Sequence, residues 1–329
     1  MTSLRSVFAS ATALATLSFT IPTASWAEQP IPVVATFSIL GDMVERIGGE
    51  HIALTTLVGP EGDTHVYQPT PKAARSVAEA DLLFMNGLEF EGWLERLAEA
   101  ASFDGAMVVA TTGISPIAFE EHEDNDHDEH AGHDEHDEHD EHAGHDEHAG
   151  HDHGTFDPHA WQSLDNALIY ANNIAAGLAQ ADPANASEYY TNRAAFVAEI
   201  VALKSDIDAM MAALPADKRT VVTPHDAFGY FAEAYDLTFE APQGMSTESE
   251  VSAADVAALI TQIRRESISA VFIESITDNR MMEQIANETG ATIGGTLYSD
   301  ALSGETGPAS TYLDMMRHNA TTLSDALGS

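Results

Sequence analysis

The chain has 329 residues, of which 44% are hydrophobic, and this is enough to bury the cores of about two domains. Its formal net charge is −40; residues 120–153 hold 16 acidic and no basic residues, so the rest of the chain still carries −24. Such an acidic surface repels phosphate backbones and anionic lipid heads and concentrates cations, which disfavours binding to nucleic acids or membrane surfaces and favours a cationic ligand.

Residues 1–27 have the pattern of a secretory signal peptide. Arg5 precedes an apolar segment at residues 7–21, and small residues at Ser25 and Ala27 match a cleavage site. The apolar segment is short for a membrane span, so we predict cleavage rather than a membrane anchor. The chain has no cysteine, hence no disulfide and no site for a lipid anchor. We therefore expect a protein that is free in the periplasm.

Short apolar segments alternate with helix-like segments along the mature chain. Alternation of this kind is typical of parallel βα units. We therefore predict an α/β fold of two lobes, each with a four-stranded, mostly parallel sheet flanked by helices. The eight predicted strands begin at Ile31, Ile52, Asp81, Ala106, Thr220, Leu237, Ala270 and Thr292.

One long helix is predicted at residues 182–214, between an N-terminal lobe (28–181) and a C-terminal lobe (215–329). Asp182 and Pro183 are suited to the N-cap and the first helical position, and apolar residues follow at steps of mostly three and four. A helix of about 30 residues would be roughly 45 Å long.

A histidine-rich tract occupies residues 120–154 and interrupts the N-terminal lobe. From His127 to His151 a histidine returns at every third residue, among Asp, Glu, Ala and Gly. Because the tract is highly charged and poor in apolar residues, we expect it to be disordered without metal. Its histidines are candidate weak zinc sites: His122, His127, His130, His133, His136, His139, His142, His145, His148, His151 and His153.

Five histidines lie outside the tract, and three of them follow predicted strands. His65, His159 and His225 fall at carboxyl ends of strands, the edge where open α/β sheets bind ligands, and Asp300 follows the last strand. Three imidazoles and one carboxylate suit tetrahedral zinc, although copper(II) and nickel(II) would also bind such a set. We predict that these four residues form a tight site in a cleft between the lobes. The other two, His51 and His318, are expected at the surface or at helix ends.

Four motifs carry a resemblance to a known family: "DTHVYQPTP", "DPHAW", "TPHDAFGYFAEAYDL" and "LYSDALSGETGPASTYLDMMRHN". With the long inter-lobe segment and the histidine-rich insert, they resemble the cluster A-I metal-binding receptors of ABC importers, in particular the zinc-specific ZnuA type. The likeness covers nearly the whole mature chain.

The resemblance implies two α/β lobes joined by a rigid helix, with His65, His159, His225 and Asp300 as ligands. Manganese members usually have glutamate at the position of His225, so this histidine points to zinc. Some zinc members carry glutamate where this chain has Thr64, which puts an extra carboxylate ligand in doubt. The implied partners are an ABC permease in the inner membrane with its cytoplasmic ATPase, and a periplasmic zinc chaperone is a further candidate. We expect a monomer that is not an enzyme.

Three other functions are considered. The protein could be a receptor of the same family for manganese or another divalent metal, a periplasmic zinc buffer or chaperone in which the tract is the main site, or a zinc hydrolase. A hydrolase needs an open coordination position, whereas four protein ligands would close the sphere. Glu274, at the end of a predicted strand, is a candidate partner that orients a ligand imidazole.

Overall fold

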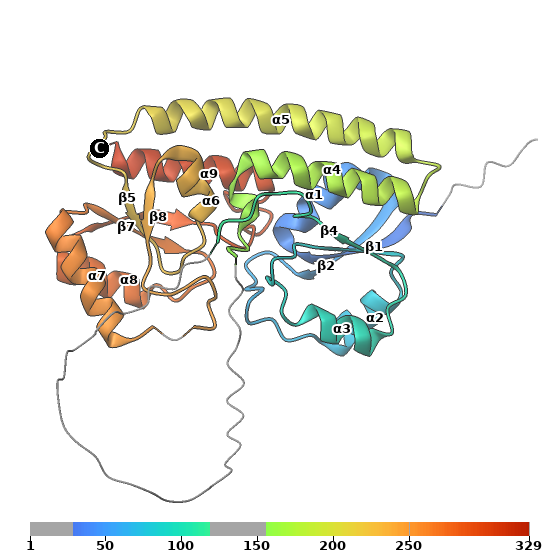
Figure 1. Ribbon diagram of the computed structural model, residues 1–329, viewed down its shortest axis with the longest axis horizontal. Helices are drawn as coiled ribbons and strands as arrows, with labels where there is room; N and C mark the ends of the chain where they lie inside the picture. Colours follow the sequence, from blue (N-terminus) through green and yellow to red (C-terminus); the bar gives the residue numbers. More distant parts are fainter. Residues whose placement is uncertain (1–28, 119–155, 250, 329) are drawn as a thin grey trace, which may run out of the picture.

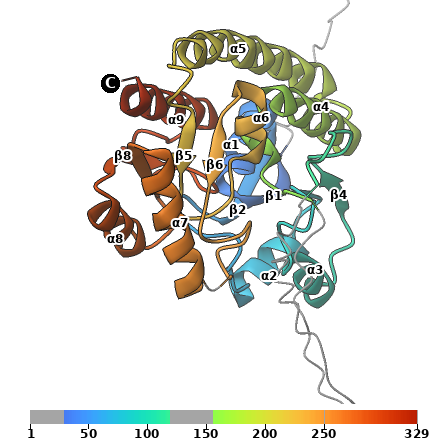
Figure 2. The same ribbon diagram turned by 60° about the vertical axis from the view of Figure 1, so that its left-hand side comes forward.

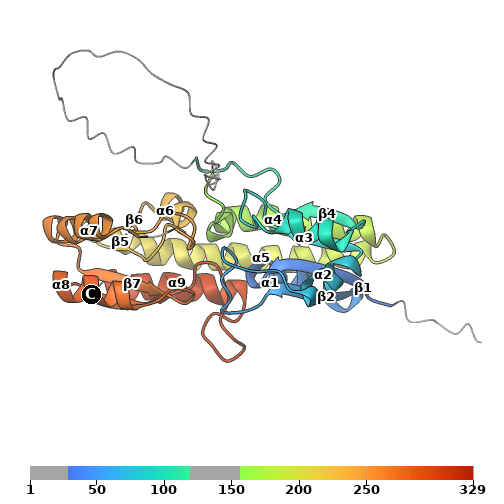
Figure 3. The same cartoon turned by 90° about the horizontal axis from the view of Figure 1, so that it is seen from below.

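The computed structural model describes residues 29–118, 156–249 and 251–328. These residues form two α/β lobes that lie side by side along one long helix, as Figure 3 shows from below. The predicted signal peptide (1–27) and the histidine-rich tract (120–154) lie outside the described residues. Within the described part of the chain, none of the helices is both long and apolar enough to cross a membrane.

The N-terminal lobe is built on a parallel sheet in the order β2-β1-β3-β4. Its central strand β1 buries every residue from Val33 to Phe37, because helices cover both faces of a parallel sheet. The elements of this lobe are β1 (Ile31–Phe37), α1 (Ser38–Gly48), η1 (Gly49–His51), β2 (Ile52–Val58), α2 (Pro71–Ala78), β3 (Leu82–Met85), α3 (Leu94–Ala101), β4 (Ala106–Val109), η2 (Ala160–Gln162) and α4 (Leu164–Ala181).

The C-terminal lobe repeats this arrangement with a parallel sheet in the order β6-β5-β7-β8. Both sheets thus have the same strand order, and the predicted pair of four-stranded α/β lobes is confirmed. The elements of this lobe are β5 (Thr220–Val222), α6 (Gly229–Tyr235), β6 (Thr238–Glu240), α7 (Ala253–Glu266), β7 (Ala270–Glu274), α8 (Arg280–Thr289), β8 (Thr292–Leu297) and α9 (Tyr312–Leu327).

The helix between the lobes, α5 (Ala186–Ala212), has 27 residues and is about 40 Å long. It runs along the top of the molecule, with α4 and α9 beneath it (Figure 1 and Figure 2). One stripe faces inward: Tyr189, Phe196, Ile200, Leu203, Ile207 and Met211. Because this stripe packs on helices of both lobes, α5 braces them against each other.

The predicted start of this helix was wrong. Asp182 does not cap α5 but ends the preceding helix α4, where its backbone N–H donates to the Leu178 carbonyl. Its carboxylate accepts hydrogen bonds from the side chains of Asn185 (2.7 Å) and Tyr189 (2.6 Å), and α5 begins only at Ala186. An Asp-Pro pair fits a turn between two helices as well as a helix start, and the sequence pattern could not distinguish them.

Buried contacts join the lobes next to the carboxyl ends of the strands. The Trp161 indole N–H of the N-terminal lobe donates to the Ser299 carbonyl at 2.8 Å, and the Tyr312 hydroxyl at the start of α9 donates to the Trp161 carbonyl at 2.8 Å. The N–H of Leu302 donates to the Ser38 hydroxyl at 3.0 Å. Together with one hydrophobic core that continues through both lobes, these bonds favour small lobe movements over wide opening.

Candidate metal centre

The structure brings the four predicted residues together between the lobes. One ligand atom from each of His65, His159, His225 and Asp300 lies within 4.8 Å of every other. The Oδ2 atom of Asp300 is 3.2 Å from His65 Nε2 and 3.3 Å from His225 Nε2, and its Oδ1 atom is 3.5 Å from His159 Nε2. All three imidazoles therefore turn the same nitrogen toward one carboxylate.

Three of these residues follow the carboxyl end of a strand, and His159 directly precedes the short helix η2. His225 follows β5 after two residues and Asp300 follows β8 after two residues, while His65 lies farther along the loop from β2 to α2. In sheets of this strand order, the ends of the central strands diverge and leave a crevice. Each lobe contributes two of the four residues.

His225 is held by the carboxylate of Glu274, the last residue of β7. Glu274 Oε2 is 2.6 Å from His225 Nδ1, and its Oε1 accepts a hydrogen bond from the His225 backbone N–H at 3.2 Å. The Ser299 hydroxyl donates to Oε2 at 2.7 Å. The carboxylate thus fixes the ring and leaves Nε2 pointing into the cluster, which is the role expected for Glu274.

A carboxylate that the sequence analysis did not single out, Asp157, holds His159 in the same way. Its Oδ1 atom is 2.7 Å from His159 Nδ1 and accepts a hydrogen bond from the His159 backbone N–H at 2.9 Å. The signal was available in the motif "DPHAW", because an aspartate two residues before a loop residue commonly accepts that residue's N–H.

Charges in the cluster depend on each other. Burial alone would lower the pKa of His225, but the carboxylates of Glu274 and Asp300 raise it well above its usual value of 6.5. For His159 the same opposition, with Asp300 and Asp157 outweighing burial, also raises the pKa. Burial alone would raise the pKa of Asp300, but His159 and His225 hold it well below 3.8. Without a metal, these contacts therefore favour the protonated forms of His159 and His225 beside an ionised Asp300.

Five buried atoms that face one another at the centre of the cluster have no hydrogen-bond partner: the Nε2 atoms of His65, His159 and His225 and both carboxylate oxygens of Asp300. His225 Nδ1 makes no hydrogen bond of good geometry either, although it lies 2.6 Å from Glu274 Oε2. Buried polar atoms are normally satisfied, and leaving them unpaired is costly. A single divalent cation at the centre would satisfy the five central atoms at once. Three imidazole nitrogens with one carboxylate match the donors of a four-coordinate transition-metal site.

Aromatic rings form the wall behind the imidazoles. The Phe90 ring lies 5.0 Å from the His65 ring, and the Trp161 ring lies 5.3 Å from the His159 ring, both edge to face. Phe90 and Trp161 also contact each other at 4.8 Å. This apolar wall excludes water from one side of the cluster and thereby strengthens the attraction between the ligands and a cation.

The two remaining histidines lie outside the cluster. His51 is at the end of η1, where its Nε2 atom is 2.9 Å from Glu188 Oε2. The His318 ring on α9 lies with Nε2 3.0 Å from the Thr296 carbonyl oxygen. Among the described residues, the four-residue cluster is the one group of His, Asp and Glu close enough to share an ion.

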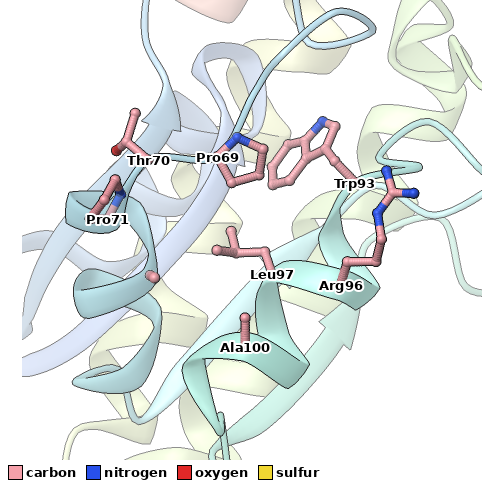
Figure 4. A pocket seen from close by; sticks show the side chains of 8 residues that line it. Pro69, Thr70, Pro71, Trp93, Arg96, Leu97 and Ala100 are labelled. Atoms are coloured by element: carbon pink, nitrogen blue, oxygen red, sulfur yellow. The ribbon is translucent and has the colours of Figure 1, made fainter.

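A separate apolar pocket of about 330 Å³ lies between α2 and α3 (Figure 4). None of its lining residues is a metal-ligating type: Pro69, Thr70, Pro71, Ala74, Trp93, Arg96, Leu97 and Ala100. Trp93 connects this pocket to the four-residue cluster, because its indole N–H donates to the carbonyl of Thr64, the residue before His65, at 2.9 Å.

Comparison with known protein families gives one match over most of the chain. Residues 33–326 match the family described as "Zinc-uptake complex component A periplasmic", ZnuA. Among relatives, the iron-binding protein YfeA of Yersinia pestis is 32% identical over 99% of this chain and 98% of its own length. The manganese-binding lipoprotein MntA of Halalkalibacterium halodurans is 29% identical over 90% of this chain and 88% of its own length.

Solved structures show the same two-lobed fold. The periplasmic zinc-binding protein TroA of Treponema pallidum superposes with a TM-score of 0.77 at 26% identity, over 91% of this chain and 99% of that one. The manganese-bound periplasmic metal-binding protein of Candidatus Liberibacter asiaticus superposes with a TM-score of 0.73 at 30% identity, over 90% and 98% of the two chains. The solved structures are thus named for zinc and manganese, and the sequence relatives for iron and manganese.

Proposed function

Because this chain belongs to the ZnuA family of periplasmic metal-binding components of ABC importers, we propose that the divalent metal it captures and delivers is zinc. Family members are transport components and not enzymes, so the hydrolase alternative is wrong. The chain works with an ABC permease and its ATPase.

The donor set is the observation that carries the proposal. Three imidazole nitrogens and a carboxylate converge on one buried point, with two of the rings turned by carboxylates so that Nε2 faces inward. Manganese sites usually contain more oxygen ligands, whereas imidazole suits the later metals of the series, including zinc. The metal ligands are proposed to be His65, His159, His225 and Asp300.

The alternative cargo is manganese or iron, which two of the relatives are named for. Affinity alone does not decide between them, since most nitrogen and oxygen sites bind zinc more tightly than manganese or iron(II). The test is therefore uptake of ⁶⁵Zn and ⁵⁴Mn by cells that carry or lack the protein. Zinc uptake should depend on the protein and survive a hundredfold excess of manganese. If the protein instead supports manganese uptake, and excess zinc does not inhibit that uptake, the proposal is overturned.

A replacement at one ligand position tests the same choice within the protein. The variant His225→Glu exchanges a nitrogen donor for an oxygen donor, so zinc affinity should fall far more than manganese affinity. Glu266→Gln, an exposed change at the end of α7, is the matched control and should alter neither. Equal losses for both metals would mean that His225 does not set the preference.

We further propose that the histidine-rich tract collects zinc for the tight site. Ala118 and Phe156, which flank the tract, pair as an antiparallel bridge, and Phe156 is only three residues before His159. The described residues on either side of the tract therefore meet beside the loop that carries a proposed ligand. Export by a signal peptide cleaved after Ala27, without a lipid anchor, is part of this proposal, and the mass of the mature protein would test it.

A further inference from the structure

The three histidines of the cluster are not held equally. The His159 and His225 side chains are fully buried, and each has a carboxylate against Nδ1, whereas the His65 side chain is 6% exposed. Among the described residues, no carboxylate lies against Nδ1 of His65. Moving His159 or His225 would break a buried pair with Asp157 or Glu274, which is costly. His65 can move without that penalty.

The loop that carries His65 is instead held by its backbone and by a neighbouring aspartate. Asp63 Oδ1 accepts a hydrogen bond from the His65 N–H at 2.9 Å, and Asp63 Oδ2 accepts one from the hydroxyl of Thr247, in the opposite lobe, at 2.6 Å. The N–H of Glu61 donates to the Leu302 carbonyl at 2.8 Å. One carboxylate thus joins the His65 backbone to the other lobe.

Thr247 is itself connected to a second proposed ligand. His225 pairs with Gln243 as a parallel bridge, and the Gln243 side-chain amide donates to the carbonyls of Thr247 (2.8 Å) and Ser249 (2.6 Å). A continuous series of contacts therefore runs from His225 through Gln243, Thr247 and Asp63 to His65. It links the fully buried His225 of the C-terminal lobe to the slightly exposed His65 of the N-terminal lobe.

We propose that Thr247 is a positioning residue that keeps His65 on the metal from across the cleft, and that His65 is the first ligand to leave when the metal is released. This inference rests on the proposed function, since it assumes a metal at the cluster. A hydroxyl-to-carboxylate hydrogen bond is strong for its size, yet it is a single bond that a docking partner could break. Release would then begin at His65, with His159, His225 and Asp300 still in place.

The test measures how fast the zinc-loaded protein gives up its metal to a chromogenic chelator in a stopped-flow experiment. Thr247→Val removes the hydroxyl and keeps the shape of the side chain. It should release zinc about tenfold faster, the size expected for one lost hydrogen bond to a charged acceptor, while zinc association stays nearly unchanged. Thr247→Ser restores the hydroxyl and should restore the slow rate. Thr321→Val, on the exposed face of α9, is the matched control.

A double-mutant cycle separates positioning from a general loss of structure. If Thr247 acts through His65, Thr247→Val should have no effect on zinc release in a His65→Ala background. An equal effect in both backgrounds, or failure of Thr247→Ser to restore the rate, would overturn the inference. If Thr247→Val releases zinc at the wild-type rate, and the wild type binds zinc tightly, the inference is also overturned. The proposed function would then remain intact. A wild type that binds zinc no better than His225→Ala would instead refute the proposed function.

Discussion

The two lobes share a strand order but present their halves of the proposed metal site differently. In the C-terminal lobe, His225 and Asp300 follow their strands directly, and Glu274 is the last residue of a strand. In the N-terminal lobe, His65 lies within a loop, and His159 follows a connection of about fifty residues after β4. The C-terminal half is thus fixed by its sheet and the N-terminal half by loops. A centre of this kind can hold a metal firmly and still open from one side.

The largest effect that separates the two halves should come from removing one ligand of each. His225→Ala deletes a donor and leaves Glu274 buried without its partner, so zinc affinity should fall about a thousandfold, since breaking a buried pair costs about 3–5 kcal/mol. His65→Ala leaves no carboxylate without an Nδ1 partner, so it should cost less, on the order of a hundredfold. Competitive titration against a zinc indicator measures both. A tight site that survives in His225→Ala would contradict the assignment of the ligands.

A smaller effect is expected from the carboxylates that orient the rings. Glu274→Gln and Asp157→Asn should each weaken zinc binding by about 10–100-fold, the usual range for partners of ligand imidazoles. The loss should be greater for Glu274, because it also accepts hydrogen bonds from the His225 N–H and the Ser299 hydroxyl. Isothermal titration would rank the two variants. Larger losses for Asp157→Asn would mean that the C-terminal half is not the firmer one.

Acid should weaken zinc binding by a comparable or smaller amount. Protons must leave His159 and His225 before a metal can bind, and the pKa of each is raised. As the pH is lowered, zinc affinity should therefore begin to fall while the pH is still above 6.5, by roughly tenfold per pH unit for each proton displaced. In the metal-free protein the sign is opposite. The raised pKa of His225 stabilises the fold below pH 6.5, and this contribution is lost as the pH rises through the raised value.

Thermal unfolding measured between pH 6 and pH 8 can separate these two contributions. Over this interval the melting temperature of the metal-free protein should begin to lose the histidine contribution, while the increase in melting temperature caused by zinc should grow. Asp300, whose pKa is lowered, stabilises the fold above pH 3.8, and this contribution is lost only as the pH falls through the lowered value. A zinc-induced increase that is independent of pH would argue against imidazole ligands.

Sequence alone predicted most of this architecture because its signals are local. Each buried strand is a short apolar segment, and His225 and Asp300 stand directly after such segments. What it missed depends on contacts between distant parts of the chain. Thr247 is 184 residues from Asp63, and no local pattern marks either as a partner of the other. Asp182 was misassigned for a related reason, since only its bonds to Asn185 and Tyr189 show that it lies between two helices.

The smallest effect on the tight site is expected from deleting residues 120–153. Because Ala118 and Phe156 already pair, a short linker can join the two ends without disturbing the His159 loop. Zinc affinity at the four-residue site should stay within about twofold of the wild-type value, as expected for a change distant from the ligands. The additional zinc ions that bind weakly to the tract should no longer be detected. Loading should become slower when zinc is scarce, because the collecting histidines are gone, and a stopped-flow experiment at submicromolar zinc would measure it. Loss of all tight binding would instead make the tract the main site and the protein a zinc buffer.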